Sequence, residues 1–188
     1  MTTEPAEALS IDRLDVIAPG AFAVAVAPLF EGARGFLGRL AMARPFGSSE
    51  AMFARAREIA HAMPPDEQVE LIDAHPRLGA PPESVSALSF VEQGYRTEGT
   101  ERAPDAAETE RARVAAELDR LNAAYEAHFG FRYCVFVAGR SRADLLPGFA
   151  TALRADRDDE VLRALDAVVD IARDRYATLT AAAVEEPA

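Results

Sequence analysis

The chain has 188 residues, of which 49% are hydrophobic and 27% charged, and its 31 acidic and 20 basic side chains give a net charge of −11. This composition is typical of a globular protein with a sizeable core, and the acidic excess excludes nucleic acid and anionic membranes as expected partners, because both are bound through clustered basic side chains. The single cysteine, Cys134, permits neither an internal disulfide nor a four-cysteine zinc site, so we expect a reducing, cytoplasmic location.

The N-terminal part of the chain contains an uncharged run from Val16 to Phe30 that includes Pro19 and Pro28. The run is shorter than the roughly 20 residues that a helix needs to cross a bilayer, so no transmembrane helix is predicted. Acidic residues near the start favour neither secretion nor organelle import. Residues 1–19 are expected to form an N-terminal segment with room for a short helix.

Hydrophobic side chains recur at helical spacing along nearly all of the remaining chain, with proline, glycine and serine where helices begin and end. This pattern predicts an all-α fold, a single compact multi-helix domain over residues 20–180, followed by a flexible tail at 181–188.

The first clear helix is expected to begin after Ser48 or Ser49, either of which can cap it, and to end at Pro64 and Pro65. Its apolar face consists of Met52, Phe53, Ala56, Ile59, Ala60 and Met63.

A second helix follows the two prolines, with its inward face at Val69, Leu71 and Ile72. It must end near Ala74, because Pro76 disfavours helical backbone angles at His75. The next stretch, residues 77–88, is dense in proline, glycine and serine, which predicts a loop. Loops held by helices often carry functional sites, and His75 stands at the mouth of this one.

Two helix starts are predicted from capping-box spacing, in which a serine bonds forward and an acidic residue three positions later bonds back. The first is Ser89 with Glu92. The second is Ser141 with Asp144, and we expect Pro147 to bend or interrupt the helix that follows.

The longest helix is expected between these two starts, after an exposed charged stretch at residues 97–110. Gly130 ends it, because glycine readily adopts the left-handed conformation that stops a helix. Its buried stripe is Val114, Leu118, Leu121 and Tyr125. The last helix of the chain has one broad apolar face, made of Val161, Leu162, Leu165, Val168, Val169, Ala172, Tyr176 and Leu179.

Residues 131–138 are rich in β-branched and aromatic side chains, which favours a strand. A lone strand has nothing to pair with, so we interpret the segment either as extended chain or as a buried helix start. Its backbone polar groups then need other partners, and a bound ligand could be one of them.

Three histidines are candidates for proton transfer near neutral pH, because the ordinary pKa of histidine is about 6.5. His61 lies within an amphipathic helix and His128 in the last turn of another, so both are interpreted as structural. His75 differs because the proline after it ends the helix. It can be catalytic, or it can merely satisfy a backbone carbonyl.

Ser89, Glu92 and Gln93 leave two interpretations open. The capping box accounts for the first two, whereas a helix start also offers free N–H groups, beside which Glu92 and Gln93 could contact a small polar ligand. Arg173 and Arg175 fall on opposite edges of the last helix's apolar face, so periodicity cannot choose between them.

Metal and nucleophile schemes find no support in the sequence, which lacks a His-Glu-x-x-His pattern, a Gly-x-Ser-x-Gly elbow and a glycine-rich phosphate loop. The apolar residues after Cys134 predict a buried, protonated thiol instead of a nucleophile. No metal site or cofactor is therefore predicted.

Several short motifs stand in a set order along residues 20–180. They are Phe30-Glu31, Arg44-Pro45-Phe46, Leu71-Ile72-x-Ala74-His75-Pro76-Arg77-Leu78-Gly79, Ser89-x-x-Glu92-Gln93, Leu121-Asn122-x-x-Tyr125, Phe129-Gly130-Phe131, Val137-x-Gly139-Arg140-Ser141 and Ile171-Ala172-x-x-Arg175. In this order they resemble the OHCU decarboxylase family, whose members convert 2-oxo-4-hydroxy-4-carboxy-5-ureidoimidazoline to (S)-allantoin in urate degradation.

The resemblance implies an all-helical enzyme that needs no cofactor, acts on a small molecule and forms a homodimer. It places the catalytic histidine, glutamate and arginine on His75, Glu92 and Arg175. It also implies substrate contacts from Pro76, Ser89, Gln93, Tyr133, Cys134 and Val135.

The residue types fit the chemistry of that substrate, because a ring C=N beside the carboxylated carbon can accept the electron pair that CO₂ leaves behind. We hypothesise that His75 exchanges a proton with the hydroxyl group or the imine nitrogen, while Glu92 orients His75 or the ureido group. Arg175 would bind carbonyl or carboxylate oxygens through its planar fork.

Two alternatives stay open. Many family members have Ser-Pro-Trp shortly after the early Phe-Glu, whereas Gly32-Ala33-Arg34-Gly35 follow here and the chain has no tryptophan. This departure favours a divergent, inactive helical interaction module, in which Ser89 and Glu92 only cap a helix and His75 only terminates one. The second alternative keeps the decarboxylation and changes the substrate to a related ureido or β-imino acid.

Overall fold

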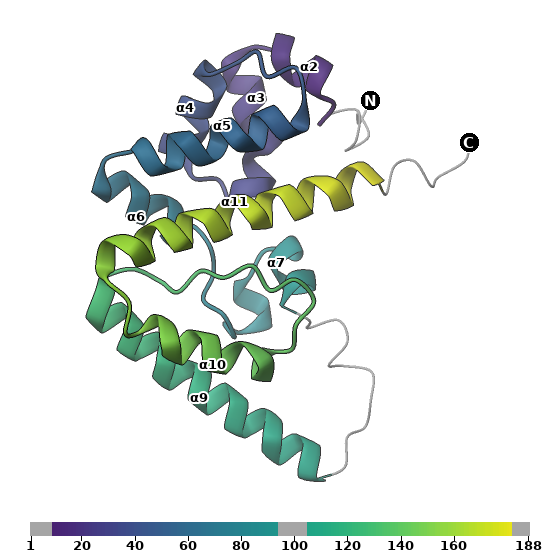
Figure 1. The fold of residues 1–188 in the computed structure, drawn as a ribbon. Coiled ribbons are helices and arrows are strands. Elements are labelled where there is room, and N and C mark those ends of the chain that lie inside the picture. Colours follow the sequence, from purple (N-terminus) through teal and green to yellow (C-terminus); the bar gives the residue numbers. More distant parts are fainter. Residues whose placement is uncertain (1–8, 94–104, 182–188) are drawn as a thin grey trace, which may run out of the picture. The chain divides into compact units, whose positions relative to one another are not determined.

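The computed structural model describes residues 9–93 and 105–181. Within these ranges the chain forms nine α-helices and two short 3₁₀ helices and contains no strand (Figure 1). The predicted all-α fold class is therefore confirmed. In the same ranges no helix has both the length and the apolarity that crossing a bilayer requires.

The described chain divides into two compact units. The first unit takes in residues up to 74 together with those from 165 onward, and the second takes in residues 75–164. The border falls at His75 on one side and within the last helix on the other. The predicted segment bounds, 1–19, 20–180 and 181–188, stay a prediction.

In the first unit, α4 packs against α3, α5 and α6 (Figure 1). The helices of this unit are α2 (Ile11–Val16), α3 (Pro19–Val26), the 3₁₀ helix η1 (Ala27–Phe30), α4 (Arg34–Met42), α5 (Ser49–Ala62), α6 (Pro65–Asp73) and the greater part of α11 (Arg157–Ala181). The ring centroids of Phe30 and Phe36 are 4.8 Å apart, and both rings are buried. The helix that follows Gly32 therefore packs into this core without a tryptophan.

The two helices predicted around the paired prolines are confirmed. The hydroxyl of Ser48 caps α5 by accepting a hydrogen bond from the backbone N–H of Ala51 at 3.1 Å. Every residue of the predicted apolar face is buried except Ile59, which is half-buried. In α6, Leu71 and Ile72 are buried, as predicted, whereas Val69 of the predicted inward face is half-buried.

Arg44 joins the ends of two helices of the first unit. Its Nε donates to the carbonyl of Ala41 at 2.7 Å, and its Nη1 donates to those of Leu14 at 2.7 Å and Ile17 at 2.6 Å. The guanidinium carbon lies 4.8 Å from the ring centroid of Phe22. Carbonyls at helix ends have no partner within the helix, so this one side chain satisfies groups that would otherwise need water.

In the second unit, α10 packs along the long helix α9 (Figure 1). The helices of this unit are η2 (Pro82–Ser84), α7 (Ala87–Glu92), α9 (Asp105–Phe129), α10 (Arg142–Ala152) and the first part of α11. The predicted buried stripe of α9 is confirmed, and Gly130 ends the helix with φ +79°. The Ser141–Asp144 capping box is present at the start of α10.

Two details of the helices differ from the predictions. Pro147 does not interrupt α10, which continues from Arg142 to Ala152, because a proline removes only one bond of the helical ladder, and the alternative that it bends the helix stays a prediction. In α11, Leu162 is 40% exposed, whereas Ala164 and Ile171, absent from the predicted face, are buried. The buried face of α11 is thus rotated away from Leu162.

Most of the predicted exposed stretch at 97–110 lies outside the described residues, and residues 108–110 are exposed.

Replacing Arg44 by lysine should lower the free energy of unfolding by about 2 kcal/mol, because a single ammonium group cannot serve three carbonyls spread around a planar fork. Urea unfolding followed by far-UV circular dichroism measures the change. Arg39→Lys is the matched control, since Arg39 pairs with Glu67 on the exposed surface, and its substitution should change the stability much less. Equal effects of the two substitutions would contradict the role given to Arg44.

Candidate functional site

His75 follows Ala74, the C-cap of α6, and lies at the start of the second unit. Only 3% of the residue is exposed, and the Nη1 group of Arg132 donates to its backbone carbonyl at 3.2 Å. Pro76, the next residue, is partly exposed. The predicted catalytic histidine is therefore a buried side chain on a backbone position that an arginine holds.

Two side-chain amides hold the loop that follows His75. The Oε1 atom of Gln93 accepts from the backbone N–H of Gly79 at 2.8 Å, and its Nε2 donates to the carbonyl of Arg77 at 3.3 Å. From α9, Asn122 donates to the carbonyl of Leu78 at 3.0 Å. These bonds give Gln93 a positioning role for the loop, and its predicted contact with substrate stays a prediction.

Gly79 is the point of closest approach between this loop and α9. Its φ is +81°, and a Cβ atom at this position would lie 2.9 Å from the Cδ1 atom of Leu118. Both the left-handed backbone and the short contact require glycine. Arg77 forms an ion pair with Glu126 of the same helix. The loop is thus fixed to α9 by packing, by hydrogen bonding and by charge.

The capping box predicted for Ser89 and Glu92 is wrong. Ser86 is the N-cap of α7, and its hydroxyl accepts from the backbone N–H of Ser89 at 3.2 Å. Ser89 therefore lies inside α7, 2% exposed, while Glu92 is its last residue and Gln93 its C-cap. The suggestion that Glu92 and Gln93 flank free N–H groups of a helix start is wrong for the same reason, because they lie at the opposite end. Because Ser86 already caps the helix three residues before Ser89, neither Ser89 nor Glu92 takes part in an N-terminal cap.

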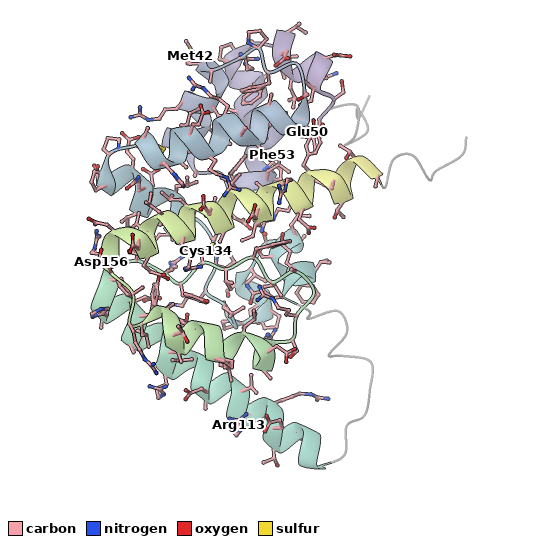
Figure 2. All side chains as sticks on the ribbon, in the orientation of Figure 1. Met42, Glu50, Phe53, Arg113, Cys134 and Asp156 are labelled. Carbon is pink, nitrogen blue, oxygen red and sulfur yellow. The ribbon has the colours of Figure 1, made fainter. Side chains whose placement is uncertain are left out.

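The segment around Cys134 is extended chain, as one of the two interpretations predicted (Figure 2). Tyr133 and Cys134 are buried, Val135 is partly exposed, and burial raises the pKa of Tyr133. Arginine side chains satisfy three of the backbone carbonyls that were expected to need partners. Arg163 donates to the carbonyl of Cys134 at 3.0 Å, and Arg140 donates to the two carbonyls of residues 136 and 137.

In the first unit, Arg175 is the arginine of α11 that points inward. Its side chain is 1% exposed, and its Nη2 lies 2.8 Å from the Oε1 atom of Glu31. Its Nη1 donates to the carbonyls of Pro28 at 3.0 Å and Leu29 at 3.4 Å. Arg173, by contrast, has a 63% exposed side chain and pairs with Asp170 on its own helix. The structure thus makes the choice that periodicity left open.

Sequence reasoning did not identify Glu31 as the partner of Arg175. The Phe30-Glu31 pair was noted only as part of the family pattern, with no role for the carboxylate. Glu31 has φ +50°, in the left-handed region that a glutamate seldom adopts. A buried arginine requires a carboxylate partner, and this requirement was the one signal that could have led to Glu31.

The remaining histidines lie on the surface. His61 is exposed and its Nε2 lies 2.8 Å from the Oδ1 atom of Asp166, and His128 is exposed beside the ring of Phe129. Among the described residues, no group of three or more histidine, cysteine, aspartate or glutamate side chains is placed to hold a metal ion.

Most of the predicted candidates belong to the second unit, namely His75, Ser89, Glu92, Gln93 and the 133–135 segment. Arg175 belongs to the first unit.

Comparison with known proteins adds a family match. Residues 17–177 match the model of a family described as OHCU decarboxylase. The uric acid degradation bifunctional protein PucL of Bacillus subtilis (strain 168) is 28% identical over 151 residues, which make up 80% of this chain and 28% of that protein. The uric acid degradation bifunctional protein of Bacillus sp. (strain TB-90) is 22% identical over 164 residues, 87% of this chain and 31% of that protein. The chain thus spans less than a third of the length of either relative.

Two solved structures share the fold. A crystal structure of OHCU decarboxylase in the presence of (S)-allantoin matches with a TM-score of 0.62 at 21% identity, covering 82% of this chain and 96% of that one. A crystal structure of (S)-allantoin synthase matches with a TM-score of 0.61 at 16% identity, covering 90% of this chain and 54% of that one.

Replacing Gly79 by alanine should lower the free energy of unfolding by about 2 to 3 kcal/mol, because the left-handed backbone and the contact with Leu118 each add strain. Gly130→Ala is the matched control, since Gly130 has nearly the same φ and no neighbouring atom within 4 Å of an added Cβ. It should cost about 1 kcal/mol from the backbone alone. Urea unfolding measures the loss of stability in both variants. Equal losses would mean that the Leu118 side chain moves aside at little cost, and they would contradict the prediction.

Proposed function

The chain belongs to the OHCU decarboxylase family, and on this premise we propose that it converts 2-oxo-4-hydroxy-4-carboxy-5-ureidoimidazoline to (S)-allantoin in urate degradation. The observation that carries the proposal is the family match over residues 17–177, nearly the whole chain. The two Bacillus relatives, which are named for uric acid degradation, support the same pathway.

The reaction asks little covalent chemistry of the protein. Loss of CO₂ leaves an electron pair that the C=N bond of the substrate ring accepts, so the proposal includes no cofactor. The protein has to hold the substrate in one orientation, keep water out and deliver a proton to one face of the product. Buried side chains on a fixed backbone suit this task, because a displaced proton donor would give both enantiomers.

His75 is the proposed general acid and base. Its burial and the fixed loop after it support this role, because Gln93, Asn122 and Leu118 hold the backbone that carries it. Glu92, half-buried at the end of α7, is proposed to orient His75 or the ureido group. Pro76, Ser89, Gln93 and the segment Tyr133, Cys134 and Val135 are the proposed substrate contacts.

Arg175 is the proposed ligand of substrate carbonyl or carboxylate oxygens. The net charge of −11 gives an anionic substrate no general attraction, so a local cation is needed. The ion pair with Glu31 and the bonds to the carbonyls of Pro28 and Leu29 fix the orientation of the guanidinium plane. Glu31 is therefore part of the proposed function as the residue that positions Arg175.

We also propose that the protein acts in the cytoplasm as a homodimer that takes a small-molecule substrate and binds neither nucleic acid nor membrane. The acidic net charge and the single reduced cysteine support the location and the absence of polyanionic partners. Sedimentation velocity on the purified chain tests the homodimer.

The inactive interaction module stays an alternative, favoured by the missing Ser-Pro-Trp motif. Its premise that Ser89 and Glu92 cap a helix is wrong, because Ser86 is the N-cap of α7. A related ureido acid as substrate stays a second candidate, and comparing turnover of such acids with that of the urate-derived compound separates the two.

Replacing His75 by asparagine should leave the fold intact and lower kcat/KM by about two to four orders of magnitude, the usual contribution of a positioned acid or base. The measurement is the rate and enantiomeric purity of allantoin formation, followed by circular dichroism on freshly generated substrate, which decays spontaneously. His61→Asn is the matched control, because His61 lies on the surface, and it should retain activity. An unchanged rate in the His75 variant would contradict the role of His75 as general acid and base.

Replacing Arg175 by lysine should raise KM by about tenfold or more, because an ammonium group lacks the bidentate geometry of the fork. Arg173→Lys serves as the control on the same helix, since its side chain is exposed, and it should leave KM unchanged. Thermal unfolding of both variants measures how much stability is lost with the Arg175–Glu31 ion pair, so that this loss is separated from the change in KM. A KM that responds to Arg173 and not to Arg175 would contradict the choice of arginine.

A further inference from the structure

A carboxylate to which neither the sequence nor the proposed function gives a role is buried in the second unit. Glu160, in the first turn of α11, is 2% exposed. Its Oε1 atom accepts from the hydroxyl of Tyr125 at 2.6 Å and from Nη2 of Arg163 at 2.7 Å, and its Oε2 atom accepts from Nε of Arg163 at 2.8 Å. Both oxygens of the buried carboxylate are thus satisfied by donors, which a buried charge requires.

Arg163 connects this carboxylate to the extended segment. Its Nη1 donates to the carbonyl of Cys134 at 3.0 Å, and its guanidinium carbon lies 4.9 Å from the ring centroid of Tyr133. That ring stacks on Phe149 with centroids 3.7 Å apart and planes inclined by 11°. The guanidinium of Arg163 therefore donates to the carboxylate of Glu160 through two of its nitrogens and to the extended segment through the third.

The protonation states keep these bonds in place at neutral pH. Burial by itself would lower the pKa of Arg163, but the hydrogen bonds to Glu160 and the charge of that carboxylate outweigh it and raise the pKa. Burial, followed by the hydrogen bond to Glu160 and its charge, raises the pKa of Tyr125. The arginine stays charged and the tyrosine keeps its proton, so both remain donors.

An exposed pair on α9 shows what a simple helix-surface ion pair looks like. Glu117 and Arg120 have the same spacing of three residues and the same two-pronged geometry, at 2.8 and 2.6 Å, but their side chains are 35% and 61% exposed. Such surface pairs contribute little to stability. The Glu160–Arg163 pair differs by its buried carboxylate and by its third bond, which reaches residue 134.

We propose that Arg163, held by Glu160, is a positioning residue for substrate binding: it fixes the Cys134 carbonyl and the Tyr133 ring, and thereby the shape of the pocket wall made by residues 133–135. This inference rests on the proposed function, in which that segment contacts the substrate. The substrate class is the same ureido acid as in the proposed function.

The first test does not depend on activity. Cys134 is the chain's single cysteine and is buried, so an aromatic disulfide that releases a coloured thiolate reacts with it only when this segment opens, either locally or by global unfolding, and urea unfolding of each variant gives the global contribution. The double variant Glu160→Gln/Arg163→Met removes both charges and leaves no buried ion unpaired. It should react about tenfold faster than the wild type, because the opening loses one charge-assisted hydrogen bond.

The matched control is Glu117→Gln/Arg120→Met, which should react at the wild-type rate. Arg163→Lys is the second variant, because its ammonium keeps the charge beside Glu160 but cannot also reach the carbonyl of Cys134, so it should react nearly as fast as the double variant. If circular dichroism shows that the double variant is unfolded, the labelling rate of the Arg163→Lys variant is compared with the wild type instead. Equal reaction rates of folded Arg163 variants and wild type overturn the proposal.

The second test is kinetic, on freshly generated substrate. A displaced wall weakens binding, so KM should rise by about tenfold while kcat stays within about threefold of the wild type. A purely structural loss would instead reduce the active fraction, and with it kcat, at constant KM. Faster labelling with unchanged KM overturns the role in substrate binding. If the wild type itself forms no allantoin, the proposed function fails together with the substrate named here, and the labelling rates alone then decide whether Arg163 fixes the segment.

Discussion

Backbone carbonyls that lie outside the helical ladders must find donors, and in this chain arginine side chains supply many of them. Arg44 serves the ends of α2 and α4, Arg132 the carbonyl of His75, Arg163 that of Cys134, and Arg175 those of η1. All 20 basic residues of the sequence are arginines, whose planar fork donates to two or three acceptors at once. An all-helical chain with long irregular connections depends on such donors, because no sheet is present in the described residues to pair with those connections.

The same constraint explains why the candidate site can be rigid although most of it is not helical. The loop after His75 is fixed by side-chain amides and by the close approach of Gly79 to α9, and the wall around Cys134 is fixed by an arginine that a buried carboxylate holds. Arg175 has its own support from Glu31. The loop after His75, the segment around Cys134 and the side chain of Arg175 are thus each held by a second residue for which the sequence analysis gave no supporting role.

Helices and their ends were predictable wherever one local rule applied without competition. Ser48, the paired prolines and Gly130 mark ends that the structure confirms. The rule failed at Ser89, because Ser86 offers an equally good hydroxyl three residues earlier and the chain takes the first one. For the segment at 131–138 the sequence left two interpretations open, extended chain or a buried helix start, and the structure has the first. Its partners could not be found from helical spacing, because Arg163 lies 29 residues further along the chain and Arg140 follows the turn that ends the segment.

The amino-acid sequence by itself determined the fold class, most helix ends, the position of His75 beyond the end of a helix, and the two arginines of α11 that could turn inward. Tertiary structure alone decided between those arginines. Helical periodicity places Arg173 and Arg175 on opposite edges of the apolar stripe, and it carries no information about which edge meets the rest of the protein. The buried face of α11 is rotated toward Arg175, where Glu31 and the carbonyls of η1 receive the guanidinium, while the edge with Leu162 and Arg173 stays exposed. A contact between residues some 145 positions apart is a property of packing, and short-range spacing cannot encode it.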